Sequence, residues 1–220
     1  MRKIFFNIQA TNETIYSDPI SMGCISDHGD IFYAEFTDFS RHECEFLIEK
    51  NTLPQLKIRD LALREKNKTY KNFYCDLISN NFFVEIASDR ETVAEYLYHW
   101  VLQVTERSFL DSPNEVDIFN VGPAKYYPSM DIEFWGFNIG ERNQAFILIH
   151  RLLSSVSGGL YSVYPIVQEL ATVCRIANKE PLKFFSKMAD KERDLYHALK
   201  YVKLVKKCYD ALCNEIRIRF

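Results

Sequence analysis

Several patterns that would assign a chemistry are missing from this 220-residue sequence. Its six cysteines include no CxxC pair, so a cysteine-bound zinc site is not expected. The motifs GxSxG, HExxH and GxGxxG and the P-loop are absent as well. The sequence therefore carries no signature of a serine hydrolase, a zinc peptidase, a dinucleotide-binding enzyme or a P-loop enzyme.

Long apolar runs and an excess of basic charge are also lacking. No apolar run approaches the roughly 18 residues that a membrane-spanning helix needs. We see no signal peptide, and we expect a cytoplasmic protein with reduced thiols and no membrane partner. The formal net charge is -3. A global basic field that would attract nucleic acid is therefore absent, although local basic patches remain possible.

What is present favours one domain spanning residues 1–220, because 47% of the residues are hydrophobic and no linker divides the chain. Apolar or alternating runs predict strands at 3–9, 19–26 and 31–39. The short connection "DHGD", with Gly29 supplying a permissive backbone, predicts a tight turn between the last two. These three strands are expected to form an antiparallel meander.

The rest of the chain predicts strands alternating with helices. Helices are expected at 42–50, 88–104, 142–154, 163–178 and 182–216, and strands at 82–87 and 116–121. We interpret residues 57–71, which are rich in charge, as a solvated surface segment. This order favours an α/β fold with a mixed sheet, of which the ribonuclease H-like sheet is one example.

Two blocks carry a resemblance to a known family. "KIFFNIQATN…PISMGCISDHGDIFYAEFTDF" and "YHALKYVKLVKKCYDAL" resemble the first and last blocks of the small bacterial 3'–5' exoribonuclease-like group of the DEDDh exonuclease superfamily. "SDRETVAEYLYHWV" and "GPA" at 122–124 resemble its middle more loosely. The resemblance implies a ribonuclease H-like mixed sheet with flanking helices. It also implies a site in which four acids hold two divalent cations and a histidine is the general base.

Every position that the resemblance assigns to catalysis has been replaced. The acids fall on Asn7, Gln9, Val121 and Tyr201, and the histidine falls on Tyr196. An amide brings no charge to a cation, valine brings no ligand, and a phenol with a pKa near 10 is a poor base at neutral pH. We therefore expect no metal and no catalytic residue.

The leading hypothesis is a catalytically inactive exonuclease-like protein that acts as a binding or regulatory module. A prophage or defence-related setting is compatible with it. Two alternatives stay open. One is a working metal-dependent 3'–5' exonuclease with a remodelled site that uses magnesium or manganese. The other is a structural subunit, for example a homodimer formed through the last helix.

The partner is expected to be a protein, ahead of single-stranded nucleic acid. The acidic stretch 111–141 would repel phosphate. Basic stretches at 57–71 and 200–219 give the nucleic-acid candidates, which are Arg64, Lys66, Lys68, Lys203, Lys206 and Lys207. We further expect the strand at 116–121 to lie beside the first strand, and residues 7, 9, 121, 196 and 201 to converge on one site.

Overall fold

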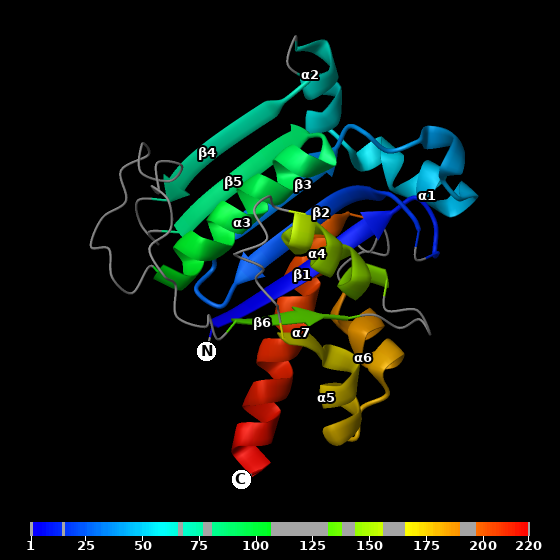
Figure 1. The fold of residues 1–220 in the computed structure, drawn as a ribbon. Coiled ribbons are helices and arrows are strands. Elements are labelled where there is room, and N and C mark those ends of the chain that lie inside the picture. Colours follow the sequence, from blue (N-terminus) through cyan, green and yellow to red (C-terminus); the bar gives the residue numbers. More distant parts are fainter. Residues whose placement is uncertain are drawn as a thin grey trace.

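A computed structural model describes residues 2–14, 16–65, 68–76, 81–106, 132–137, 144–155, 166–189 and 197–219. In these residues the fold is α/β, with a seven-stranded sheet in the order β4-β5-β3-β2-β1-β6-β7. The sheet contains both parallel and antiparallel pairs, and helices pack on it (Figure 1). The expected mixed α/β sheet is thus confirmed.

The predicted meander forms the centre of the sheet. Strands β1 (Arg2–Ala10), β2 (Pro19–Ser26) and β3 (Ile31–Phe36) pair antiparallel in sequence order. Gly29 in the turn before β3 has a φ of 101°, a value that favours glycine. Asp30 fixes this turn, because its carboxylate accepts hydrogen bonds from the Ser26 hydroxyl and the Phe82 backbone N–H.

Two parallel strands extend the sheet beyond β1. β6 (Ile132–Gly136) pairs parallel with β1, and β7 (Ile166–Glu169) pairs parallel with β6. The strand expected at 116–121 lies outside the described residues. Among the described residues, β6 occupies the place beside the first strand where that strand was expected.

On the other side of the meander, β5 (Asn81–Ser88) pairs parallel with β3, and β4 (Tyr70–Asp76) pairs antiparallel with β5. The segment 57–71, which was interpreted as a solvated surface segment, contains the helix α2 (Ile58–Arg64) and the start of β4, which the sequence did not predict. On the inner side of α2, Ile58 and Ala62 are buried. The charges that suggested a solvated segment lie mostly on its outer side.

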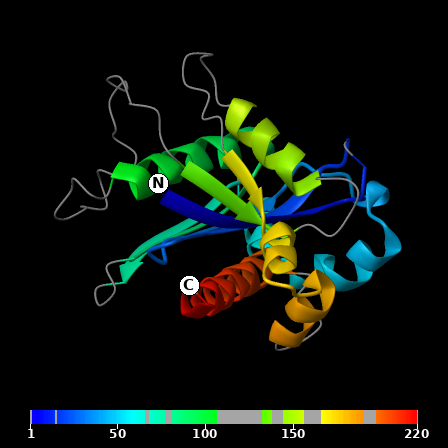
Figure 2. The same ribbon diagram turned by 90° about the horizontal axis from the view of Figure 1, so that it is seen from below.

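Helices cover the sheet in two layers (Figure 2). On one face lie α3 (Arg90–Glu106) and α4 (Gln144–Ser155). On the other lie α7 (Ala198–Arg219), α5 (Leu170–Ile176) and α6 (Pro181–Met188). The short helices η1 (Arg41–Glu43), α1 (Phe46–Asn51) and η2 (Leu53–Gln55) follow β3. None of the helices described is long and apolar enough to span a bilayer.

Three expected helices are in fact divided. The segment predicted as one helix at 163–178 contains β7 followed at once by α5, and the segment at 182–216 contains α6 and α7. The apolar residues of β7 fit a helical period as well as an extended one, so periodicity alone did not separate them. The predicted helix at 42–50 is broken into η1 and α1.

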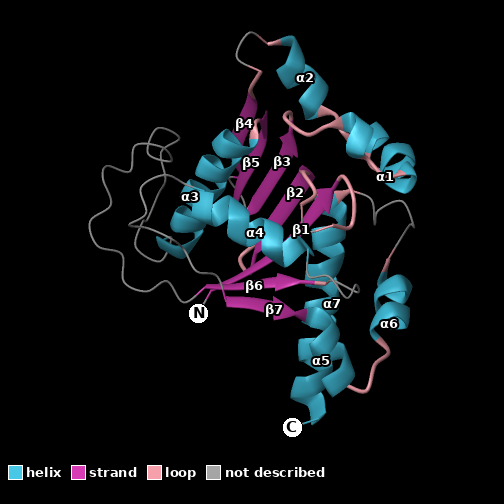
Figure 3. Cartoon of the chain, turned by 45° about the vertical axis from the view of Figure 1, so that its right-hand side comes forward, coloured by secondary structure: helices cyan, strands magenta, loops and turns pink. Residues whose placement is uncertain are grey.

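Alternation along β1 sets which side chains reach each layer. Ile4, Phe6 and Ile8 point into the core beneath α3 and α4. Phe5 belongs to the core beneath α7, so Asn7 and Gln9, which share its side of the strand, face the α7 layer. Figure 3 shows β1 within the sheet, flanked by β2 and β6.

Candidate functional site

Asn7 and Gln9 form a hydrogen-bonded amide pair on the α7 side of β1. The Gln9 Nε2 donates to the Asn7 Oδ1 over 3.0 Å. Asn7 is buried and Gln9 is half-buried. The two amides therefore satisfy each other in a place where two carboxylates would repel each other unless a cation lay between them.

The start of α7 rests directly on the strand beside Asn7. Asn7 is paired with Gly23 across β1 and β2. A Cβ atom on Gly23 would lie 2.8 Å from the Cα of Leu199 and 2.9 Å from the carbonyl carbon and oxygen of Ala198. Only glycine lets the helix backbone approach this closely. Gly23 thus brings the first turn of α7 down next to the amide pair.

Tyr201 connects the same turn of α7 to the end of β6. Its hydroxyl donates to the backbone carbonyl of Phe137 over 2.8 Å. Phe137 follows β6 directly, and since Phe5 pairs with Trp135, Phe137 lies level with Asn7 on the neighbouring parallel strand. Burial raises the pKa of the Tyr201 phenol, so the hydroxyl stays protonated and acts as a donor.

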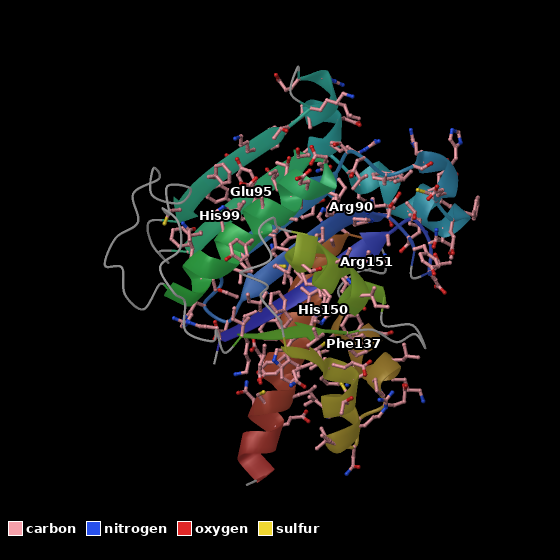
Figure 4. All side chains as sticks on the ribbon, viewed as in Figure 1. Arg90, Glu95, His99, Phe137, His150 and Arg151 are labelled. Atoms are coloured by element: carbon pink, nitrogen blue, oxygen red, sulfur yellow. The ribbon has the colours of Figure 1, made fainter. Side chains whose placement is uncertain are left out.

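Aromatic rings fill the space beside this hydrogen bond. The rings of Phe137 and Phe185 are stacked with centroids 4.1 Å apart, and Phe185 lies 5.1 Å from the Tyr201 ring. Figure 4 shows Phe137 beside β6, while the labelled residues of α3 and α4, among them His99 and His150, belong to the helices of the other face. The three rings pack the space between β6, α6 and α7.

The structure thus brings three of the five predicted site residues, Asn7, Gln9 and Tyr201, to one side of the sheet beneath the start of α7. Val121 and Tyr196 lie outside the described residues. His197 directly follows Tyr196, the position to which the resemblance assigns the catalytic histidine. Its ring stacks on the ring of Tyr33 with centroids 5.1 Å apart. It therefore lies over β3, whereas the amide pair lies on β1.

The predicted basic residues lie on different elements, and two of them have partners within the protein. Lys206 pairs with Asp210 at 2.7 Å, and Lys207 donates to the carbonyl of Met188 at 3.2 Å. Lys203 is exposed on α7. Arg64 ends α2 and Lys68 stands just before β4, whereas Lys66 is outside the described residues.

One buried acid near the site is not among the predicted site residues. Glu35 is 1% exposed and lies in the same row of the sheet as Gln9, with Ser21 between them. Its carboxylate accepts from the Tyr33 hydroxyl at 2.8 Å and from the backbone N–H groups of Lys57 and Arg59 at 3.0 and 2.7 Å. Burial raises its pKa, and these donors oppose the shift. The alternating run "IFYAEF" could have indicated that this glutamate is buried, because its position falls on an inward-facing side of the strand.

The residues described at this site do not fit a pair of divalent cations. Asn7 and Gln9 are neutral, the Tyr201 hydroxyl is committed to a backbone carbonyl, and Glu35 is held at the start of α2. Elsewhere in the described ranges, no group of three or more His, Cys, Asp or Glu side chains is arranged to hold a metal ion. What the arrangement provides is a packed, uncharged contact between a helix and a sheet.

Comparison with known proteins does not assign this arrangement to a family. The chain matches no protein-family model, and no curated protein matches it.

Proposed function

We propose that this protein is a catalytically inactive, exonuclease-like binding module built on a ribonuclease H-like sheet. The support from the fold is the three-stranded meander, the parallel strand beside β1 and the helices on both faces. This is the arrangement that the resemblance of the first and last sequence blocks implies.

The observation that carries the proposal is the hydrogen bond from Tyr201 to Phe137, together with the paired amides of Asn7 and Gln9. The resemblance assigns acids to these three positions. Here each of the three is neutral and has a partner within the protein, and Phe137 and Phe185 pack against the tyrosine. Divalent cations need anionic oxygen ligands, which these residues do not supply.

An exposed apolar group at the end of β1 favours a protein as the partner. Phe46 and Leu47 of α1 are 73% and 56% exposed, and Tyr16 is 79% exposed. The backbone N–H of Glu45 donates to the Thr11 carbonyl over 2.8 Å, which holds the start of α1 against the segment that leaves β1. Large apolar side chains that remain in water near one another mark interaction surfaces.

The test is an assay of hydrolysis with the full chain. Single- and double-stranded RNA and DNA, labelled at the 5' end, are incubated with magnesium or manganese, and we expect no shortening from the 3' end. Shortening that co-purifies with the protein and disappears in Glu35→Gln, the nearest buried acid, would instead support a working exonuclease with a remodelled site.

A second measurement addresses the binding surface. Phe46→Ser and Leu47→Ser should abolish binding of a purified partner protein while leaving the thermal midpoint unchanged, because neither side chain is buried. Lys187→Ser, at an exposed position of α6, is a control that should retain binding.

A further inference from the structure

The loop between β1 and β2 is held against the start of α1. The Thr11 backbone N–H donates to the Asp18 carbonyl over 2.9 Å, which closes the loop at its base. The Glu45 side chain accepts a hydrogen bond from the backbone N–H of Glu13 over 3.2 Å, beside the bond from the Glu45 N–H to the Thr11 carbonyl. Tyr16 is therefore carried on a loop that is tied to the residue just before α1.

The inner side of α1 packs on the core and leaves its first two residues outward. Ile48 packs against the main buried cluster, and Leu53, which follows the helix, is buried in that cluster. Phe46 and Leu47 remain exposed beyond the end of β1 (Figure 1). Together with Tyr16 they form what we call the α1 surface. Because α1 is anchored through Ile48, these side chains stay in water unless a second molecule covers them.

Acidic side chains flank the α1 surface. Four glutamates of the loop and of the segment 41–50 are exposed, namely Glu13, Glu43, Glu45 and Glu49. Within the described part of the chain, none of the four forms an ion pair. The arginine and lysine of the same segment, Arg41 and Lys50, are fewer, and the Lys50 ammonium lies 5.9 Å from the centre of the Phe46 ring. The protein thus leaves an excess of negative charge around an apolar surface.

This charge decides which partner fits. Apolar contacts discriminate little between partners, whereas charges around an interface favour the opposite sign and disfavour their own. The net charge of -3 on the whole chain acts in the same direction. A second copy that used the same surface would bring the same glutamates into the contact, so like charges would oppose it. The surroundings of the α1 surface therefore favour a basic partner.

We propose that the α1 surface binds a basic amphipathic helix of a partner protein. The apolar side of such a helix covers Tyr16, Phe46 and Leu47, and its lysine or arginine side chains meet the surrounding glutamates. The Phe46 ring, which already lies near Lys50, offers these cations an aromatic face as well. This inference rests on the proposed function, because it takes the same binding surface and names the class of partner.

Three synthetic peptides serve as probes of the full chain. Each is two heptads long with leucine at helical spacing, and the remaining positions carry lysine, glutamine or glutamate. Fluorescence anisotropy of the labelled peptides measures affinity at low and physiological salt. We expect the lysine peptide to bind about tenfold more tightly than the glutamine peptide, and the glutamate peptide to bind most weakly. These differences should shrink as salt is added.

One double variant tests the apolar part of the surface. Phe46→Ser combined with Leu47→Ser should weaken both the lysine and the glutamine peptide by about tenfold, because both depend on covering these side chains. The thermal midpoint should stay unchanged, since neither side chain is buried. Unchanged affinity for both peptides would overturn the proposal.

A second double variant tests the charge. Glu43→Gln combined with Glu49→Gln should weaken the lysine peptide severalfold and leave the glutamine peptide unaffected. The matched control, Glu65→Gln combined with Glu95→Gln, removes the same charge from exposed positions outside α1 and should bind the lysine peptide normally. If the control weakens this peptide as much, the total charge and not the α1 surface is recognised, and the proposal is overturned.

The remaining outcomes separate this inference from the proposed function. Sedimentation of the full chain detects self-association, and a dimer that Phe46→Ser and Leu47→Ser dissociate would overturn the proposal, because the chain itself would cover the surface. Binding of a purified partner through Phe46 and Leu47, without binding of the lysine peptide, would overturn the chemistry of the partner and leave the proposed function standing. Shortening of nucleic acid from the 3' end would count against the proposed function and leave the peptide result unaffected.

Discussion

The hydroxyl of Tyr201 donates a hydrogen bond to the backbone carbonyl of Phe137 across 2.8 Å, although 64 residues of chain separate the two. The bond ties the start of the last helix to the residue that follows β6. Phe137 is 4% exposed, so its carbonyl has little access to water in place of the tyrosine. Together with the close approach of α7 to Gly23, this contact helps to fix where α7 lies relative to β1 and β6.

Removing only this hydroxyl should therefore destabilise the fold. We expect Tyr201→Phe to lower the free energy of unfolding by about 1–3 kcal/mol, because a buried carbonyl is left without a donor. Urea unfolding measures the change. Tyr16→Phe is the control, since Tyr16 is 79% exposed and its loss of a hydroxyl should have little effect. Equal stabilities of the two variants would contradict this role of Tyr201.

Gly23→Ala should displace α7. The added methyl group would lie 2.8 Å from the Leu199 Cα, and backbone atoms cannot rotate away as a side chain can. Overpacking of this kind costs about 1–3 kcal/mol. We expect lower stability in urea and faster amide exchange in the first turns of α7. Unchanged exchange there would show that the helix does not rest on Gly23.

Restoring the two acids of β1 should not restore a nuclease. In the combined variant Asn7→Asp, Gln9→Glu, two carboxylates would replace the present amide hydrogen bond in a largely buried place. We expect lower stability at pH 7 and no hydrolysis with magnesium or manganese, because Tyr201 still supplies no charge. Thermal unfolding with and without manganese, beside an assay of hydrolysis, measures both effects. A large manganese-dependent rise in the midpoint, accompanied by 3' shortening, would contradict the prediction.

His197 should make the free energy of unfolding depend on pH between its pKa in the unfolded chain and its pKa in the folded protein. Its pKa is lowered from 6.5 to about 4 in the folded protein. Between these two values the unfolded chain binds a proton that the folded protein does not, so stability falls as the pH is lowered through the window and is fully present above it. Because the ring is partly exposed and solvent weakens the effect, we expect the free energy of unfolding to fall by on the order of 2 kcal/mol across this pH range.

Urea unfolding at pH 7.5 and pH 4.5 tests this dependence. His197→Phe should lose less stability between these pH values than the unaltered protein. Glu35 acts in the opposite direction, because its raised pKa makes the folded state less stable as the pH rises through that pKa. Since both proteins contain Glu35, the difference between them isolates the histidine. Identical pH dependence in the two proteins would show that His197 titrates normally.

The sequence alone identified the central meander, because alternation and a glycine turn are local signals. It also predicted α3 and α4, whose apolar residues recur at helical spacing. It missed β4 and α2, because their inward residues are few and their outer sides are charged. It joined β7 to α5, because nothing in the local pattern separates a short strand that runs directly into a helix.

For the candidate site, the sequence determined the chemistry at single positions, and the tertiary structure decided which of them meet. That Asn7, Gln9 and Tyr201 carry no charge at neutral pH can be read from the residues themselves. The meeting of Tyr201 with Phe137, the closeness of α7 to Gly23 and the stacking of His197 on Tyr33 depend on helix packing over distant strands. Periodicity reports which side of an element is apolar, but it holds no information on where two elements cross. Those crossings came only from the fold.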